Sequence, residues 1–522
     1  MTTLFNHPRL FTAVALVTAL VSCSKDQLEV KNPNDVAIDE FYASENDALA
    51  GLAGVYDGYQ YQELAGSFYR QLEIISDNGQ NNSLPDILEI ASSNHTSSNA
   101  IVQSFWTFYY NVISRANRLI SNVNAMPEAS ISQAARKRIV AEAIFLRAYA
   151  YLDLTALYGD IPFYIEPVGP SNSPLGKTSR TEIRAYMVND LASAIPDLPS
   201  SLLGNENGRI SSWAAKALLG KYYLYEQEWQ KAAQQFKDII DSRSYSLYPD
   251  FSKLFTPNGE YSSESLFEIG FIEGGTDNGE SFSTQVDTTL APIIPTGGWR
   301  PSESLVNSFP AIDGKPVSGP DPSPLYEASE PYENRDPRLR ATVYTELDFS
   351  PADGRKYWNF SNSNRFAVRK YSWYSKTQYA NNEGPQNYYM IRYADVLLMY
   401  AEAQNEYAAL PDGSVYDALT AIRERAGIIP GPDQLYGLKA GMTQQEMRLA
   451  IRDERRWELA LEHQRYFDLL RWGIAESVIN SIDPNPKGKK FTAPRDYLWP
   501  YPQSEMDNNS ILKAEGQNPG WE

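Results

Sequence analysis

The chain has 522 residues, of which 42% are hydrophobic, so it is long enough to bury a large globular core. Its formal net charge of −19 argues against nucleic-acid binding, because phosphate recognition needs a basic surface. The single cysteine excludes a disulfide framework and a cysteine-based metal site. The three histidines lie too far apart in sequence to indicate a zinc site or a histidine-dependent catalytic triad.

The N-terminus has the pattern of a secretory signal. An apolar run over residues 10–21 is too short to span a bilayer as a stable helix, but it suits the core of a signal peptide. The run leads into LVSC, which resembles a bacterial lipobox and ends at the sole cysteine, Cys23. We therefore predict a lipoprotein signal peptide over residues 1–22, and a lipidated Cys23 with a polar tether over residues 23–46. An ordinary signal peptide followed by a buried cysteine is the alternative.

Residues 47–248 have the character of a helical region. Ser44 or Asn46 can cap the first helix, which several glycines interrupt. Gly159 and Pro162 mark the end of the third helix. The expected helices cover residues 47–75, 102–123, 132–158 and 180–194, and a polar loop over residues 76–99 separates the first two.

Residues 211–242 fit the spacing of a tetratricopeptide helix pair. Gly220 is small enough to let two antiparallel helices approach, and Phe236 fills the seam between them. A weaker copy follows at YADVLLMYAEAQNE and VYDALTAIRERAG, with Ala401 and Ala418 at the small positions. Since one such pair cannot bury its apolar face alone, we predict a mainly α fold built on stacked helix pairs.

Residues 249–385 differ from the helical regions on either side. They are rich in Gly, Pro, Asn and Ser, with short β-like pieces such as SLFEIGF and RFAVRKY. We expect irregular loops and a few short strands packed against the helices, and long loops of this kind are usually functional or disordered. Residues 386–522 are helical again, but they end in a tail with too much Pro and Gly for long regular structure.

The segment RDERRWELALEHQRYFDLLRWG has no Pro and no interior Gly, which predicts one long helix over residues 446–472. Opposite charges three residues apart can pair on such a helix. The candidate pairs are Arg455–Glu458, Glu462–Arg465, Arg465–Asp468 and Asp468–Arg471. Because Trp, Tyr and Leu are interleaved with them, we expect a partly buried ion network in which Arg455 and Arg465 are structural. A solvated helix face is the alternative.

This segment also carries a family resemblance. The pattern ER-x-x-EL-x-x-E-x-x-R-x-x-DL-x-RWG, from Glu454 to Gly473, resembles the C-terminal region of SusD/RagB-type outer-membrane nutrient-binding lipoproteins. Four further stretches resemble the family: RYADVLLMYAEAQNE, AEAIFLRAYAYLDLTALYGDIP, residues 105–120, and the tail with WPYP and QNPGW. The WPYP and PGW variants depart from the family pattern but preserve its character.

The resemblance implies tetratricopeptide-like helix pairs that support a loop-rich ligand face. It implies a lipoprotein on the outer surface of a Bacteroidetes-type outer membrane, closing as a lid over a SusC-like TonB-dependent transporter. Ligands in the family are mostly oligosaccharides and some members take peptides, so we expect a glycan, with a peptide as the alternative. No cofactor and no nucleic-acid partner is expected, and a structural calcium ion is left open.

The matched motifs are scaffold, so the ligand residues are sought in the divergent segments. Sugar rings stack on aromatic side chains, while their hydroxyls need Asp, Asn or Arg partners. The candidate ligand-binding residues are Asp77, Asn78 and Asn81 after the first helix, and Trp299, Arg300, Tyr357, Trp358, Trp373 and Tyr374 in the long irregular section. For each aromatic residue, the alternative is that it packs a loop onto the core.

Two other function classes compete with a binding lipoprotein. A glycosidase needs two carboxylates about 5–10 Å apart, and with 65 acidic residues such a pair arises by chance. No nucleophile motif, phosphate loop or metal cluster stands out, so we predict no enzymatic activity. The other class is a protein-interaction solenoid whose loops hold a partner and no small ligand.

Overall fold

The computed structural model describes residues 41–61, 64–65, 67–81, 84–169, 171–272, 299–348, 365–371, 385–483, 485 and 488–522. This part of the chain is mainly helical with a few short strands, as the sequence predicts. Most of its buried hydrophobic residues belong to one continuous core. Within the same ranges, no helix combines the length and hydrophobicity needed to cross a membrane.

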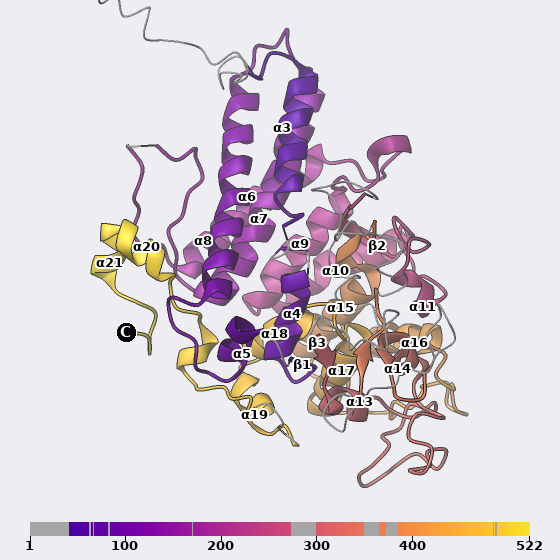
Figure 1. Cartoon of the computed structure of the whole chain (residues 1–522). Helices are drawn as coiled ribbons and strands as arrows, with labels where there is room; N and C mark the ends of the chain where they lie inside the picture. The colour runs from indigo at the N-terminus through magenta and orange to yellow at the C-terminus, as the bar shows by residue number, and fades with distance from the viewer. Residues whose placement is uncertain are drawn as a thin grey trace, which may run out of the picture.

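The N-terminal helices form a continuous stack. They are α3 (Glu45–Asp57), α4 (Ser67–Ile75), α5 (Pro85–Ala91), α6 (Ala100–Ala125), α7 (Gln133–Tyr158), α8 (Arg180–Ala194), α9 (Ser212–Tyr225) and α10 (Trp229–Ser242). Figure 1 shows α3, α6 and α7 side by side at the top of the molecule, and each packs on the other two. Helix α8 packs on α7, and α9 packs on both α8 and α10.

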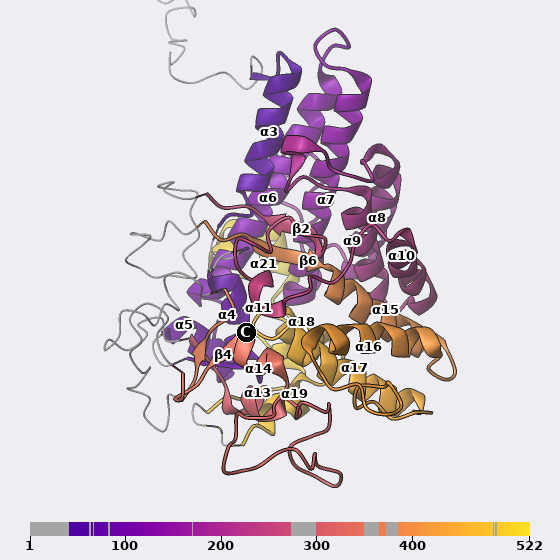
Figure 2. The same ribbon diagram turned by 90° about the vertical axis from the view of Figure 1, so that its right-hand side faces the viewer.

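The C-terminal helices continue this stack. They are α11 (Phe251–Leu254), α13 (Glu303–Ser308), α14 (Pro337–Thr342), α15 (Tyr393–Tyr407), α16 (Gly413–Ala426), α17 (Gln444–Glu458), α18 (Gln464–Arg471), α19 (Ala475–Asn480), α20 (Gln503–Asn508) and α21 (Ser510–Glu515). Helix α15 packs against α10 on one side and against α16 and α17 on the other. Figure 2 shows α9, α10, α15, α16 and α17 following one another down one side of the molecule.

The strands form three antiparallel pairs. The pairs are β1 (Gly79–Asn81) with β3 (Trp299–Pro301), β2 (Ser265–Ile269) with β6 (Tyr388–Arg392), and β4 (Val343–Tyr344) with β5 (Ala367–Val368). The SLFEIGF piece contains β2 and the RFAVRKY piece contains β5, as predicted. Because β6 leads directly into α15, the β2–β6 pair ties the irregular region to the helical stack.

The helix boundaries follow local capping chemistry. Ser44 caps α3 as expected, because its backbone N–H donates to the Asp47 carboxylate at 2.7 Å while its hydroxyl accepts from the Asp47 N–H. The first expected helix is in fact two, α3 and α4, and α8 matches its prediction. The loop predicted over residues 76–99 is wrong in part, since it contains β1 and α5. Pro85 opens α5, where its fixed φ suits the first turn.

The predicted tetratricopeptide-like pair is α9 with α10. A Cβ placed on Gly220 would lie 2.7 Å from Cε1 of the Phe236 ring, which is closer than packed atoms tolerate. Phe236 is fully buried, so the missing side chain at Gly220 makes the room that its ring fills. The weaker copy is also confirmed as α15 with α16.

The single helix predicted over residues 446–472 is wrong. Helix α17 ends at Glu458 and α18 starts at Gln464, and between them Leu461 and His463 adopt left-handed φ values of 64° and 66°. The Lys370 ammonium lies at this break. It donates hydrogen bonds to the carbonyl oxygens of Glu458 and Ala460, at 3.2 and 2.8 Å. A distant cation thus replaces the helical hydrogen bonds that these carbonyls would otherwise accept.

A buried ion network does form, but between elements. Of the four expected pairs, Asp468–Arg471 is the one found as an ion pair among these described side chains, at 2.8 Å. The other charges of the segment pair with the RYAD-x-x-x-x-YAEA motif and with more distant residues. These contacts are Arg392–Glu458, Arg392–Glu462, Asp395–Arg455, Glu402–Arg471 and Arg338–Glu454. All of these residues except the partly exposed Arg471 are buried, so the solvated-face alternative is wrong.

Candidate functional site

The structure brings together two groups of predicted ligand residues that are far apart in the chain. Strands β1 and β3 form a two-stranded ribbon in which Gln80 lies opposite Arg300 and Asn81 lies opposite Trp299. The pairing extends beyond the strands, because the Ser302 N–H donates to the Asn78 carbonyl at 2.8 Å. We call this element the β1–β3 ribbon.

Asp77 and Asn78 enter the ribbon from α4, but their side chains are buried and paired with protein groups. The Asp77 carboxylate lies 2.8 Å from Arg465 and 2.9 Å from Arg456. Burial raises its pKa, but the two guanidinium groups outweigh this and hold the pKa of Asp77 well below its usual range. Asn78 donates to Glu73 at 2.8 Å and accepts from Arg456 at 2.9 Å. These contacts make both side chains structural, contrary to the expectation that they face a ligand.

Lys489 fixes the same turn from the C-terminal region. Its buried ammonium donates to the carbonyl oxygens of Ser76 and Gly79. Burial lowers the pKa of Lys489 to about 7, and burial raises the pKa of the neighbouring Glu73 to about 7. The start of β1 is therefore held by charged groups from both ends of the chain.

We expect that replacing Arg465 with Ala lowers the free energy of unfolding by about 3 kcal/mol, because it removes one of the two cations that neutralise a buried carboxylate. Arg465 also stabilises the turn through its backbone N–H, which donates to Glu73 at 3.2 Å and remains in the variant. Chemical denaturation of Arg465→Ala, Asp77→Asn and the double variant measures the coupling. Additive losses, or an unchanged melting temperature in Arg465→Ala, would contradict a buried pair.

The remaining predicted ligand residues divide into two sets. Asn81 and Trp299 belong to the ribbon as an opposed pair, and Arg300 is 3% exposed on the adjacent position. The other set, Tyr357, Trp358, Trp373 and Tyr374, lies outside the described residues. The predicted lipidation residue Cys23 also lies outside them. Strand β5 packs against β3. In the sequence, β5 lies between the pair Tyr357–Trp358 and the pair Trp373–Tyr374, so both pairs flank, along the chain, a strand that contacts the ribbon.

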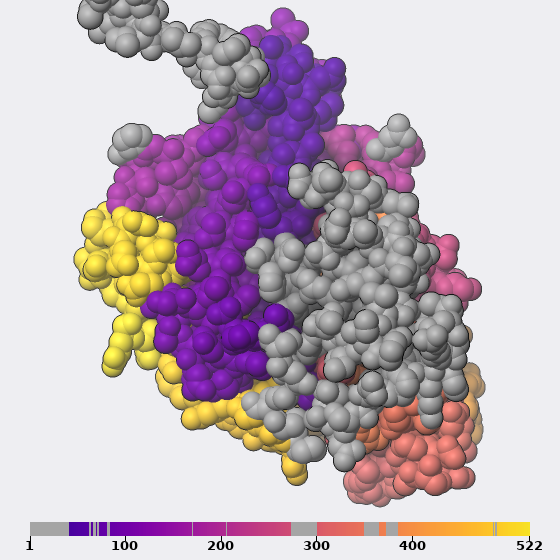
Figure 3. All heavy atoms as spheres, viewed as in Figure 1, coloured from indigo at the N-terminus to yellow at the C-terminus, as the bar shows by residue number. Residues whose placement is uncertain are grey.

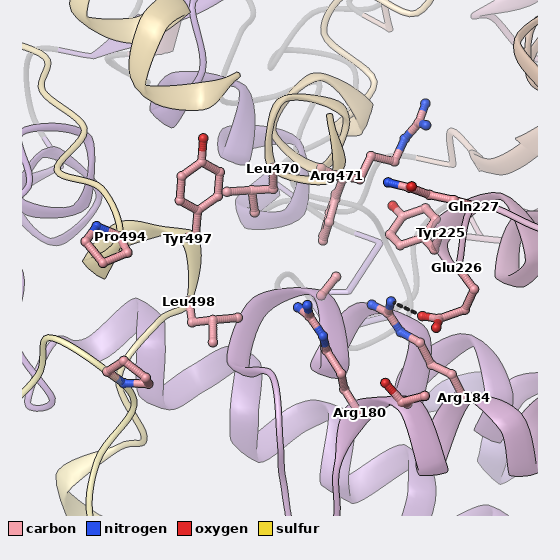
Figure 4. A pocket seen from close by; sticks show the side chains of 14 residues that line it. Arg180, Arg184, Tyr225, Glu226, Gln227, Leu470, Arg471, Pro494, Tyr497 and Leu498 are labelled. Carbon is pink, nitrogen blue, oxygen red and sulfur yellow. Dashed lines mark hydrogen bonds and ion pairs between the residues drawn. The ribbon is translucent and has the colours of Figure 1, made fainter. Parts of the chain in front are cut away.

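A separate cavity of about 510 Å³ lies between α8, the α9–α10 turn, α18 and the C-terminal tail. Figure 4 shows Arg180 and Arg184 rising into it from α8, with Tyr497 and Leu498 on the opposite wall. Arg184 pairs with Glu226 at 2.7 Å. The lining mixes charged, amide and aromatic side chains, which is a composition able to hold a small polar molecule.

Sequence reasoning missed the cavity and the support of the ribbon. Leu470 and Arg471 line the cavity, but they belong to a motif assigned to the scaffold. Lys489 and Arg456 fix the turn before β1, yet no spacing in the sequence connects them to Asp77. No cluster of three or more His, Cys, Asp or Glu side chains suited to a metal ion is present in the described ranges.

Two family models match the chain. One, described as the SusD family, matches residues 263–521, and the other, described as starch-binding associating with outer membrane, matches residues 26–224. The chain belongs to the SusD family. The second description links this family to the outer membrane.

SusD-like proteins of known sequence and structure match along nearly their whole length. A SusD-like protein of Formosa agariphila is 29% identical, covering 97% of this chain and 98% of its own. The crystal structure of a SusD-like carbohydrate-binding protein from Bacteroides fragilis superposes with a TM-score of 0.77 at 26% identity, covering 90% of this chain and 99% of its own. A laminarin-binding SusD-like protein superposes with a TM-score of 0.73 at 26% identity, covering 92% and 100%.

Proposed function

We propose that this SusD-like protein is a cell-surface lipoprotein that captures oligosaccharides and delivers them to a SusC-like TonB-dependent transporter of the outer membrane. The observation that carries the proposal is the end-to-end match to SusD-like proteins, one of which is a carbohydrate-binding protein and another a laminarin-binding protein. No catalytic family is indicated by these matches, which supports a binding role without turnover.

The β1–β3 ribbon supports the choice of site. It joins the polar segment over residues 77–81 to the aromatic segment at Trp299, and the sequence predicts ligand contacts in both. Strand β5, which contacts it, connects the segments that carry Trp358 and Trp373. We propose that aromatic side chains of Trp299 and of these two segments form stacking platforms for sugar rings.

The test is a binding screen of the chain starting at Ser24, which lacks Cys23, against soluble glycans and a peptide pool. Calorimetry measures binding while product release from labelled polysaccharide is followed in parallel. Saturable binding to one glycan class without turnover supports the proposal. Binding to peptides alone assigns the same capture role to a peptide ligand, turnover points to an enzyme, and binding only to the transporter favours a protein-interaction role.

We expect that replacing Cys23 with Ala moves the protein from the membrane fraction to the soluble fraction, because acyl chains on Cys23 would supply the anchor. Membrane fractionation followed by immunoblotting measures the distribution. Replacing the neighbouring Ser24 with Ala is the matched control and leaves the protein in the membrane. A Cys23→Ala variant that stays with the membrane would rule out the lipid anchor.

A further inference from the structure

Two polar side chains on the β1–β3 ribbon have no hydrogen-bond or ion-pair partner among the described residues. Gln80 and Arg300 are directly opposite in the antiparallel register, so their side chains share one face of the ribbon. Both residues are buried, with Arg300 3% and Gln80 9% exposed. In the part of the chain that the structure describes, neither side chain forms a hydrogen bond or an ion pair, and Nε of Arg300 is buried without a partner.

Other buried arginines of this protein have a counter-charge or carbonyl partners, even where Nε itself is unpaired, as in Arg147, which pairs with Asp190 at 2.5 Å. Arg392 is neutralised by three carboxylates, those of Glu264, Glu458 and Glu462. Arg335 has no such carboxylate among the described side chains, but its guanidinium donates to the carbonyl oxygens of Val306 and Phe309 and of two prolines. Among the described residues Arg300 has neither kind of partner, and burial alone lowers its pKa.

A buried cation without a counter-charge is expensive, because it has lost its hydration and gained no attraction in return. Such a group is expected where a ligand supplies the missing charge, since proteins break the rules of polar satisfaction mainly at functional sites. Arg300 and Trp299 are adjacent in β3, and adjacent strand positions face opposite sides, so Arg300 lies on the other face of the ribbon from the Trp299 position. The unpaired charge therefore belongs to the ribbon of the proposed ligand site, on its second face.

We propose that Arg300, with Gln80 beside it, binds an anionic substituent of the ligand, so that the glycan captured is an acidic oligosaccharide. This inference rests on the proposed glycan-binding function. The guanidinium fork matches the paired oxygens of a carboxylate or of a sulfate ester, and the Gln80 amide can bond a neighbouring hydroxyl. Both anions offer paired oxygens to the guanidinium, so the anionic group belongs either to a uronic acid or to a sulfated sugar.

The experiment compares three probes on the chain starting at Ser24: oligogalacturonate for carboxylates, carrageenan oligosaccharides for sulfate esters, and laminarin oligosaccharides as the neutral glycan. Carboxyl-reduced and desulfated forms are the matched ligands. The variants are Arg300→Met and Gln80→Ala. Arg180→Met is the control, since Arg180 lines the separate cavity of Figure 4.

We expect one acidic probe to bind and its neutralised form to bind at least about tenfold more weakly. Arg300→Met should weaken the acidic probe by about 30-fold or more, whereas Arg180→Met leaves it unchanged. The melting temperature of unliganded Arg300→Met should equal or exceed that of the parent chain, because an uncompensated buried charge has been removed. A purely structural arginine would instead lower it.

Four outcomes overturn the inference. Binding restricted to laminarin oligosaccharides, or acidic-glycan binding that is unchanged in Arg300→Met, rejects the anionic ligand and leaves glycan capture standing. A lower melting temperature together with unchanged affinity assigns Arg300 to the fold. Failure to bind every glycan rejects both the inference and the proposed function.

Discussion

Replacing Arg392 with Met is expected to lower the free energy of unfolding by about 3–5 kcal/mol. Arg392 is 1% exposed, and its guanidinium lies 2.8 Å from Glu264, 2.6 Å from Glu458 and 2.7 Å from Glu462. Methionine keeps much of the volume but leaves these carboxylates short of one positive charge in a place that water does not reach. Urea or guanidinium denaturation of the chain starting at Ser24 measures the loss.

The matched control for Arg392 is the exposed pair Lys237–Asp241 on α10. It is as short, at 2.7 Å, but its side chains are 50% and 61% exposed. Lys237→Met should therefore cost less than about 1 kcal/mol, because solvent screens the pair and side-chain entropy opposes it. A loss below about 1 kcal/mol in Arg392→Met as well would mean that burial does not raise the cost of breaking an ion pair in this fold.

Replacing Trp499 with Ala is expected to cost about 3–5 kcal/mol, because it removes a large buried ring and leaves a cavity. The ring is 1% exposed and packs edge-on against Phe105 and Tyr158, with centroid separations of 5.5 and 5.8 Å. Its indole N–H donates to Tyr466 at 3.1 Å, and its backbone N–H donates to the Leu157 carbonyl at 2.7 Å. Thermal unfolding and limited proteolysis of the tail measure the effect.

Trp521 provides the comparison for Trp499 within the same tail. It is partly exposed, and its indole N–H donates to the Leu498 carbonyl at 2.9 Å. Trp521→Ala should therefore cost clearly less than Trp499→Ala, since less apolar surface returns to water. Equal losses would show that the tail is held as a unit rather than through the buried WPYP segment.

Helix placement was largely predictable from sequence, because caps and breakers act within a few residues. Ser44 caps α3 as expected, and Gly159 ends α7 with a left-handed φ of 73°. The helix break at Leu461 was not predictable, because neither Pro nor Gly lies near it. At the break, the carbonyl oxygens of Glu458 and Ala460 accept from Lys370, which is distant in sequence, and the Glu458 carbonyl also accepts from Arg392.

The candidate site was predictable in part. Composition pointed to the polar segment near Asp77 and to the segment at Trp299, but it could not show that they pair as adjacent strands. Composition also could not distinguish a charged side chain that is available to a ligand from one that is buried and paired within the protein. Asp77 and Arg300 are both charged residues in polar, loop-like sequence. Asp77 is neutralised by Arg456 and Arg465, whereas Arg300 has no counter-charge among the residues that the structure describes.

The sequence by itself determined what depends on short-range order and on motif. These features are a mainly helical chain, the tetratricopeptide-like pair in which Phe236 packs against Gly220, and membership of the SusD family. Only the tertiary structure decided which charges meet. Arg392 and Glu458 are far apart in sequence but 2.6 Å apart in space. The physical reason is that a hydrogen-bonded turn or cap is fixed by neighbours a few residues away, whereas the fate of a charge depends on burial and on partners that the fold brings from elsewhere.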